Sequence, residues 1–185
     1  MNNTIQIQTP MTKDYLRRLK AGDTVYINGT VYAARDAAHK RLIALINEGK
    51  ELPVDFKDQI IYYVGPCPQK PGHVIGSAGP TTSGRMDAYA PKLIERGLTG
   101  MIGKGLRNDD VVSAMIKYGA VYFGATGGAG ALLASCIVSQ EIIAFPDLGP
   151  EALRRFKVKN FPVTVVIDSQ GNDLYKLGKE SFRQI

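Results

Sequence analysis

The chain has 185 residues, of which 44% are hydrophobic and 22% are charged. This composition suffices for one domain with a buried core and excludes a disordered tail. The formal net charge is +6, but the Lys and Arg residues are scattered. They form no block of about five or six like charges and do not alternate with aromatic residues. We therefore expect no nucleic-acid partner and favour a basic site for a small anionic metabolite.

Cys67 and Cys136 are the only cysteines and lie far apart. Two thiolates without a nearby His cannot complete a four-ligand zinc site, and an iron–sulfur cluster needs more cysteines. We expect free thiols in a reducing cytoplasm and no metal ligand in this chain. The N-terminus, MNNTIQIQTP, lacks the features of a signal peptide. No apolar run reaches about 18 residues, so no membrane-spanning helix is expected.

The first half of the chain mixes helical and β-strand patterns. Asn28-Gly29 between two β-prone runs is typical of a hairpin with a two-residue turn. Glycines follow both helical patterns and are expected to end them. The expected elements are a helix over 12–20, strands over 24–27 and 30–33, a helix over 35–48, and strands over 59–64 and 73–77.

The second half alternates apolar runs with helical patterns. Asn108 or Asp109 is expected to cap one helix and Gly119 to close it. The expected elements are helices over 86–96 and 110–118, strands over 98–102 and 120–123, a glycine turn opening a helix over 124–138, a strand over 141–145, a helical piece over 151–156, and a closing hairpin of 162–168 and 173–176. The pattern predicts an α/β fold with a mixed sheet in one domain, 1–185, in which 1–10 and 178–185 are terminal extensions.

The segment 79–87, GPTTSGRMD, concentrates groups that bind anions. Its glycines let the backbone approach a ligand, and the helix expected after it offers free N–H groups and a positive dipole end. Arg85 adds a planar fork that fits a carboxylate or a phosphate. A plain helix cap with Arg85 in solvent is the alternative, but it explains one hydroxyl and not three. The three hydroxyls belong to Thr81, Thr82 and Ser83.

Two further cations stand beside expected strand ends. Lys104 lies between two glycines just after an apolar strand, where ligands of α/β sheets bind, although a flexible surface turn explains it equally well. Arg35 stands at a helix start, where a cation is electrostatically unfavourable. An anion between Arg35 and the helix dipole would relieve that placement. His39 in the same helix is expected to be a structural hydrogen-bonding residue more often than a catalyst.

The sequence GATGGAG at 124–130 follows a strand and opens a helix, as a dinucleotide fingerprint does. However, Glu141 stands at the start of the next expected strand, whereas a ribose-binding carboxylate should stand at its end. No Gly-Lys-Ser/Thr follows, which excludes a phosphate-binding P-loop. These glycines are interpreted as close helix–sheet packing, or as backbone near a ligand.

Several segments, in this order, resemble the β-type domain of class I fumarases and L(+)-tartrate dehydratases. The resemblance covers about residues 22–175 and implies a swivelling β/β/α three-layer domain with a mixed sheet. The segments are YAARDAAHKR (32–41), IYYVGP (61–66), GPTTSGRMD (79–87), GKG (103–105) and FPVTVVIDSQGN (161–172).

This resemblance implies an iron–sulfur hydro-lyase that reversibly hydrates fumarate to malate. In the family, three cysteines of an α-type domain hold a [4Fe–4S] cluster, and one iron is left free to bind substrate. Carried over by position, Arg35, Arg85 and Lys104 would bind the substrate carboxylates, together with Thr82 in the supporting turn. Thr81, aided by Lys104, would be the catalytic base for the C3 proton of malate.

The chain departs from the family pattern in two ways. Cys67 and Cys136 lie outside any matching cluster motif, and no α-type domain is present. The resemblance therefore implies a β subunit that is inactive alone and works with a cysteine-bearing α-type subunit, as a heterotetramer or a self-associated dimer. An L(+)-tartrate dehydratase β subunit and a non-catalytic carboxylate-binding module remain open, and a nucleotide-binding oxidoreductase rests on GATGGAG alone.

Overall fold

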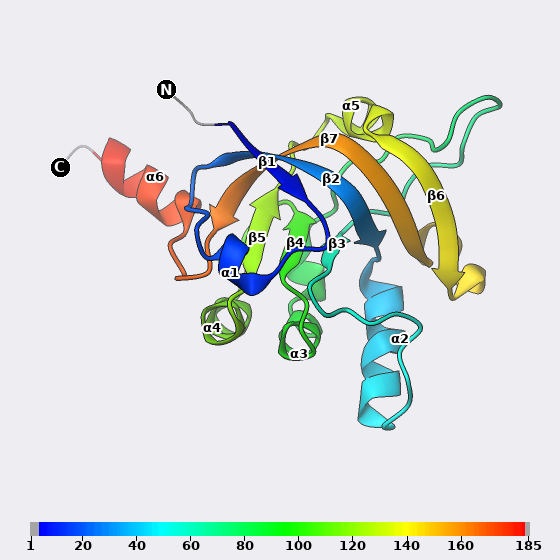
Figure 1. Ribbon diagram of the computed structural model, residues 1–185, viewed down its shortest axis with the longest axis horizontal. Coiled ribbons are helices and arrows are strands. Elements are labelled where there is room, and N and C mark those ends of the chain that lie inside the picture. Colours follow the sequence, from blue (N-terminus) through cyan, green and yellow to red (C-terminus); the bar gives the residue numbers. More distant parts are fainter. Residues whose placement is uncertain (1–3, 184–185) are drawn as a thin grey trace.

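The computed structural model describes residues 4–183, which form two layers of strands and one layer of helices. In Figure 1, helices α2, α3 and α4 lie on one side of β3, β4 and β5, and β2, β7 and β6 arch over the other side. The strands are β1 (Thr4–Gln8), β2 (Thr24–Ala33), β3 (Ile60–Tyr62), β4 (Gly100–Gly103), β5 (Val121–Gly124), β6 (Ile137–Ala144) and β7 (Leu153–Ile167). The α-helices are α1 (Lys13–Leu16), α2 (Asp36–Asn47), α3 (Ala90–Glu95), α4 (Asp109–Tyr118), α5 (Gly130–Ser135) and α6 (Leu174–Phe182), and the 3₁₀ segments are η1 (Ser83–Met86) and η2 (Pro146–Glu151).

The strands form one mixed sheet that closes on itself. Its order is β1-β2-β3-β4-β5-β7-β6, and β2 also pairs with β7. Strands β1 to β5 run parallel to their neighbours, whereas β7 is antiparallel to β2, β5 and β6. The pairing of β2 with β7 joins β2, β3, β4, β5 and β7 into a ring. This arrangement confirms the expected α/β fold with a mixed sheet and three layers.

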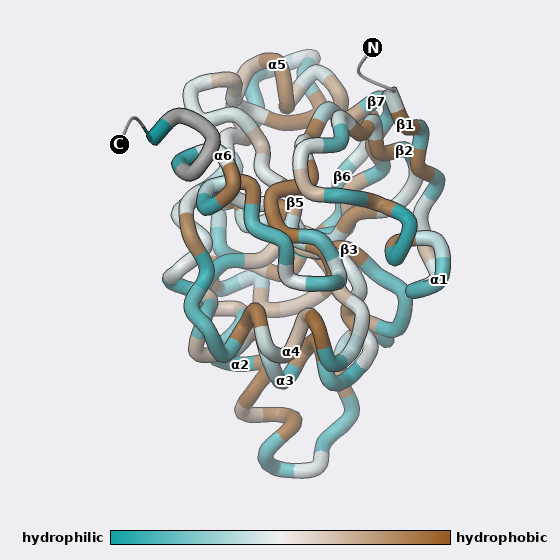
Figure 2. Tube along the Cα trace, turned by 90° about the vertical axis from the view of Figure 1, so that its left-hand side faces the viewer, coloured by the Kyte–Doolittle hydropathy of each residue, from teal (hydrophilic) through white to brown (hydrophobic). Residues whose placement is uncertain are grey.

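Each central strand is buried on both faces. On β3, Ile60 and Tyr62 belong to the core enclosed by the strands. Ile61 and Tyr63 belong to the core beneath the helices. Successive side chains point to opposite faces of a strand, so a strand covered on both sides reads as an unbroken apolar run. Figure 2 shows β5 as largely hydrophobic, whereas the helices alternate between hydrophobic and hydrophilic residues.

The hairpin expected around Asn28-Gly29 is wrong, because β2 runs straight through it. The pairing with β7 shifts register between Ile27 and Gly29, and Gly29 has a φ of 103°. The extra residue lies on β7, where Lys159 and Asn160 stand opposite Asn28, and such a β-bulge bends a pair of strands without ending either of them. The amide group of Asn28 donates to Gln6 and accepts from the backbone N–H of Asn160, so it holds neighbouring strands and does not close a turn.

Three other expectations are also wrong. Residues 73–77 form a loop, because the glycines and prolines around them prevent ladder pairing. Most of the helical piece expected over 151–156 belongs to β7, whose edges are already occupied by β2 and β6. The second arm of the closing hairpin contributes a single bridge at Asp173 and then becomes α6.

The expected limits of α4 are confirmed. Asn108 is its N-cap and accepts a hydrogen bond from the backbone N–H of Val111 at 3.0 Å, and Gly119 ends it with a left-handed φ of 77°. Residues 4–8, expected in a terminal extension, form strand β1 beside β2. Within residues 4–183, no helix is both long and apolar enough to cross a membrane.

Candidate functional site

The predicted site residues gather at one edge of the sheet, beyond the carboxyl ends of parallel strands. Arg35 follows β2, Tyr63 follows β3 and Lys104 follows β4. Strands β2, β3, β4 and β5 are parallel neighbours, so their carboxyl ends meet. Open α/β sheets bind ligands at such an edge because the chain turns away there and leaves a crevice.

Arg35 and Arg85 stand on either side of one carboxylate. Asp36 places its Oδ2 at 3.0 Å from a terminal nitrogen of Arg85 and its Oδ1 at 3.7 Å from Nε of Arg35. The Arg85 side chain is 48% exposed and the Arg35 side chain 22%. The two guanidinium groups, separated by 50 positions in the sequence, are thus neighbours in space.

The electrostatic problem of a cation at the start of α2 is solved by another side chain of this chain. Glu151 Oε2 accepts a hydrogen bond from the backbone N–H of Ala37 at 3.1 Å, and its Oε1 lies 3.3 Å from Arg35. The sequence analysis interpreted the placement of Arg35 as a pointer to function, because an anion between Arg35 and the helix dipole would relieve it. That anion is the carboxylate of Glu151, which arrives from η2.

The turn with the two threonines is tied to the strand ends by its backbone. The N–H of Thr81 donates to the carbonyl of Tyr63 at 2.8 Å, and Thr82 forms an isolated parallel bridge with Lys104. Lys104 is exposed and makes no side-chain hydrogen bond or ion pair with any residue that the structure describes. Its charge is therefore available to a ligand.

The expected set of three ligand-facing hydroxyls is reduced to two. Ser83 is fully buried, and its Oγ lies 2.8 Å from the hydroxyl of Tyr122. The helix start expected after the turn is the four-residue 3₁₀ segment η1, which has no side-chain cap. Thr81 is half-buried and Thr82 is exposed, and both remain as candidate hydroxyls beside Arg85.

Sequence reasoning missed a buried ion pair that supports this edge. Arg107 has a fully buried side chain whose Nε donates to Asp87 at 2.7 Å. The second oxygen of Asp87 accepts from the backbone N–H of Asn108, also at 2.7 Å. The guanidinium lies over the rings of Tyr63 and Tyr122. The polar run Asn108, Asp109 and Asp110 after Arg107 suggested a solvent-exposed turn, but an Asp and an Arg that each follow a candidate anion-binding turn were an available signal.

His39 is structural, as the sequence analysis favoured. It is fully buried and its Nδ1 lies 2.8 Å from the carbonyl of Arg35, with the ring edge-on to Tyr63. Burial lowers the pKa of His39 to about 4, only partly opposed by the hydrogen bond to Arg35. The ring is therefore neutral at pH 7 and donates from Nδ1.

Comparison with known families decides where the chain belongs. The model of the family described as "Fumarase C-terminus" matches residues 1–178. The chain belongs to the fumarase C-terminus family.

Relatives of this fumarase C-terminus domain fall into two kinds. It is 39% identical to the putative L(+)-tartrate dehydratase subunit beta of Methanocaldococcus jannaschii, over 90% of this chain and 88% of that protein. It is also 39% identical to the anaerobic class I fumarate hydratase of Escherichia coli K12, over 93% of this chain and 32% of that protein. Fumarate hydratase 2 of Leishmania major is 38% identical, over 92% of this chain and 31% of that protein. The chain thus spans about a third of the fumarate hydratases that it matches.

The fumarase C-terminus domain does not itself offer a cluster site within residues 4–183. No three His, Cys, Asp or Glu side chains of that part are placed to hold a metal ion. Cys67 is exposed, and Cys136 is partly buried with its thiol 3.7 Å from the carbonyl of Asn160. These residues do not fit an iron–sulfur cluster, which needs several thiolates converging on one point.

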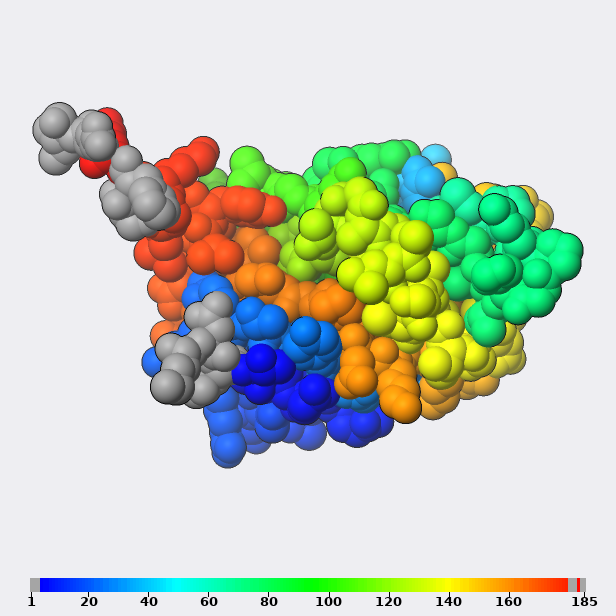
Figure 3. Space-filling view, turned by 90° about the horizontal axis from the view of Figure 1, so that it is seen from above, coloured from blue at the N-terminus to red at the C-terminus, as the bar shows by residue number. Residues whose placement is uncertain are grey.

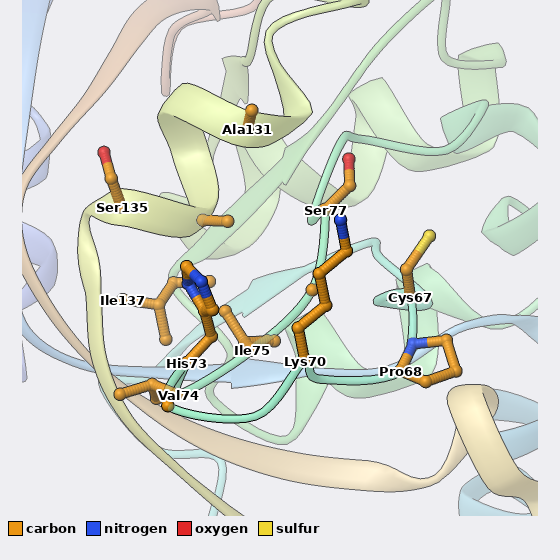
Figure 4. A pocket seen from close by; sticks show the side chains of 13 residues that line it. Cys67, Pro68, Lys70, His73, Val74, Ile75, Ser77, Ala131, Ser135 and Ile137 are labelled. Atoms are coloured by element: carbon orange, nitrogen blue, oxygen red, sulfur yellow. The ribbon is translucent and has the colours of Figure 1, made fainter.

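One cavity of the domain lies outside the candidate site. Figure 4 shows it between loop 66–77 and α5, with Lys70 and His73 at its wall. Its volume is about 710 Å³, and none of the predicted site residues lines it. The N–H of Ala78 donates to the carbonyl of Gly130 at 3.0 Å and joins the two walls. In Figure 3 this loop projects at one end of the molecule, next to β6.

Proposed function

We propose that this chain is the β subunit of a class I iron–sulfur hydro-lyase that reversibly hydrates fumarate to malate. The observation that carries the proposal is that Arg35 and Lys104, which follow the ends of β2 and β4, lie at the same sheet edge as Thr82 and Arg85 of the η1 turn. Membership of the fumarase C-terminus family supports the reaction class. A separate α-type subunit would hold the [4Fe–4S] cluster, whose chemistry is the binding of the substrate at an open iron position.

Arg35, Arg85 and Lys104 bind the carboxylates of the C4 dicarboxylate in this proposal. Negative charge builds up on a carboxylate when a proton is removed from the carbon beside it, so cations already in place stabilise the transition state. Arginine suits the task because its planar fork matches a carboxylate through two parallel hydrogen bonds. Thr82, bridged to Lys104, fixes the turn next to them.

Thr81 is the proposed site of proton transfer. In the direction from malate, the C–H bond at C3 breaks, its electron pair forms the double bond, and the hydroxyl group at C2 leaves as hydroxide, whose charge the open iron position in the α-type subunit would stabilise. The proton passes to the oxygen of Thr81. A threonine hydroxyl is a weak base, so its own proton must pass to another group, which we propose is a relay in the partner subunit, while the cationic Lys104 stabilises the negative charge left on the oxygen of Thr81.

Tartrate dehydration is the second candidate. The relative named as a tartrate dehydratase subunit beta is covered over 88% of its length, whereas the fumarate hydratases are covered over about a third. A chain of this length therefore has a similar protein among those named as tartrate dehydratase subunits. The two reactions share the carboxylate clamp and differ in the hydroxyl at the second carbon. The partly buried and exposed free cysteines suit a reducing cytoplasm in either case.

Co-expression with the α-type protein tests the proposal. The complex is reconstituted with iron and sulfide without oxygen, and fumarate hydration and tartrate dehydration are both assayed. Size-exclusion chromatography with light scattering then distinguishes a heterotetramer from other assemblies. A fully loaded complex that turns over neither acid would contradict the proposed function.

A further inference from the structure

The side chain of Glu151 contacts the substrate-binding edge from a part of the chain that the carboxylate-binding motifs do not include. Glu151 ends η2, the connection between β6 and β7. On the basis of the function proposed above, we propose that Glu151 is a positioning residue that fixes the guanidinium of Arg35 for a substrate carboxylate.

The two oxygens of Glu151 have different partners. Oε2 accepts from the backbone N–H of Ala37 at 3.1 Å, inside the first turn of α2. Oε1 lies 3.3 Å from a terminal nitrogen of Arg35. Because one oxygen is anchored to the rigid backbone of a helix, the other has a fixed place in space. The side chains of Glu151 and Arg35 are only 24% and 22% exposed, so water screens their attraction less than at an open surface.

Gly65 forms the opposite wall of the channel that holds Arg35. A Cβ on Gly65 would lie 2.8 Å from Cδ of Arg35 and 3.4 Å from the carbonyl oxygen of Pro150. The arginine side chain therefore runs between the end of the β3 segment and η2. The side chain of Arg35 makes no hydrogen bond to a residue within the described range 4–183, and its Nε is buried without a hydrogen-bond partner. The guanidinium is held in position by its ion pairs with Glu151 and Asp36 and by packing, while its terminal nitrogens, which are not buried, remain the donors for a ligand.

Two simpler roles for Glu151 make different predictions. If the carboxylate only capped α2, a glutamine, whose amide oxygen still accepts from Ala37, would leave substrate binding unchanged. If it only neutralised Arg35, removing its charge would strengthen the binding of an anionic substrate. Positioning predicts the opposite sign, because an amide NH₂ group facing Arg35 repels its donors and releases the guanidinium.

The same interface supplies a matched control. Asp147 also lies in η2 and also pairs with an arginine of α2, since Arg41 donates to its Oδ1 at 2.8 Å. That pair is exposed on both sides and does not contact Arg35. Asp147→Asn therefore loosens the attachment of η2 to α2 as Glu151→Gln does, but leaves the position of Arg35 unchanged.

The experiment compares Glu151→Gln, Asp147→Asn and the unaltered chain in the reconstituted complex. We expect Glu151→Gln to raise KM for the dicarboxylate about tenfold, with a smaller effect on kcat and an unchanged melting temperature. Asp147→Asn should leave KM within about twofold of the unaltered value. A second readout uses the isolated chains, in which the arginine Nε–H signals are followed by NMR during titration with succinate, a dicarboxylate that does not react.

Each outcome has one meaning. An unchanged or lowered KM for Glu151→Gln, in a complex that is otherwise active, overturns the positioning role and leaves the proposed function intact. If the unaltered complex turns over neither acid, the proposed function fails, and the succinate titration alone then tests the positioning role of Glu151. Weaker succinate binding to Glu151→Gln than to Asp147→Asn then supports positioning, and equal binding overturns it.

Discussion

At the scale of single residues, the arginines near the site differ in how firmly the protein holds their charge. Arg85 is about half exposed and has one partner, Asp36. Such exposed ion pairs stabilise a protein by about 1 kcal/mol or less. Arg107 is fully buried and its partner Asp87 is nearly so. In the proposed function, the first arginine exchanges its partner for a substrate, whereas the second serves the fold.

Replacing Arg85 by alanine should therefore abolish turnover and leave the fold intact. The loss of one exposed pair changes the free energy of unfolding by about 1 kcal/mol or less, while the substrate loses a bidentate partner. The measurement is kcat/KM of the reconstituted complex, with a urea unfolding curve of the isolated chain. Arg41→Ala, which removes another exposed pair on α2, is the control. An active Arg85→Ala variant would show that the clamp is assigned to the wrong residue.

His39 makes the stability of the chain depend on pH. Its pKa is lowered by burial from 6.5 to about 4 in the folded state. The stability of the neutral folded form is fully present above pH 6.5 and is lost as the pH falls towards 4. The free energy of unfolding falls by about 3 kcal/mol over this range, because the unfolded state takes up the proton at a higher pH than the folded state.

Unfolding in urea at several pH values between 7 and 4.5 measures this contribution. We expect His39→Gln to flatten the pH dependence relative to the unaltered chain. The other histidine of the sequence, His73, is exposed, so His73→Gln should leave the slope unchanged. Equal slopes for the two variants would refute the assignment to His39.

At the scale of elements, Gly29 shows how one local signal serves two structures. A two-residue type I′ turn needs residues with positive φ, but Gly29 has a positive φ inside the continuous strand β2. In this chain, the neighbours β1 and β7 occupy both edges of β2 and keep it extended. A Cβ on Gly29 would lie 2.6 Å from Oγ1 of Thr9 and 2.8 Å from its carbonyl oxygen.

Gly29→Ala should thus destabilise the protein by about 2 kcal/mol or more, since steric conflict adds to the cost of the positive φ. Gly49 is a matched control because it has a φ of 66° and nothing within 4 Å of the added Cβ. We expect Gly49→Ala to cost about 1 kcal/mol. Urea unfolding of both variants measures the difference, and equal costs would argue for an open turn at Gly29.

The ion pair of Asp87 and Arg107 joins the turn 79–87 to the turn 103–105, and these two turns carry candidate site residues. Asp87→Ala leaves the Arg107 charge buried and unpaired, which should cost about 3–5 kcal/mol. Adding Arg107→Met removes that charge and should recover part of the loss. Urea unfolding of the single and double variants gives both values. A double variant less stable than the single one would mean that the stacking of Arg107 on Tyr63 and Tyr122 matters more than its charge.

The sequence predicted the elements whose signals are local. Strands β3, β4 and β5 appear as apolar runs because both of their faces are buried, and α4 is marked by Asn108 and Gly119 at its ends. Strand β7 is not continuous in the prediction because Asn160 and Pro162 interrupt it, although the alternation of apolar and charged residues in its first half is itself a strand signal. The contacts of Glu151 with Arg35 and of Asp36 with Arg85 join distant segments, so no local pattern could show them.

At the scale of the whole molecule, the closed ring makes β7 indispensable. Strand β7 pairs with β2 and β5 in the ring and with β6 at the edge of the sheet. A chain that ends after Ala152 lacks β7 and should remain unfolded. A chain that ends after Asp173 lacks α6 but keeps the ring, so it should fold. Far-ultraviolet circular dichroism and thermal unfolding of the two truncations distinguish these results, and a folded shorter chain would contradict the role of the ring.

The pairing of β2 with β7 also has a consequence for synthesis. Its partners, such as Val25 and Val163, are separated by most of the chain. Domains that depend on such distant contacts fold slowly, because a long loop must close before the contacts repay its entropy. On the ribosome, β2 emerges early and waits with an unpaired, apolar edge until β7 has been translated. The nascent chain is thus exposed to aggregation for most of its translation, and it is during this interval that we expect a chaperone to bind it.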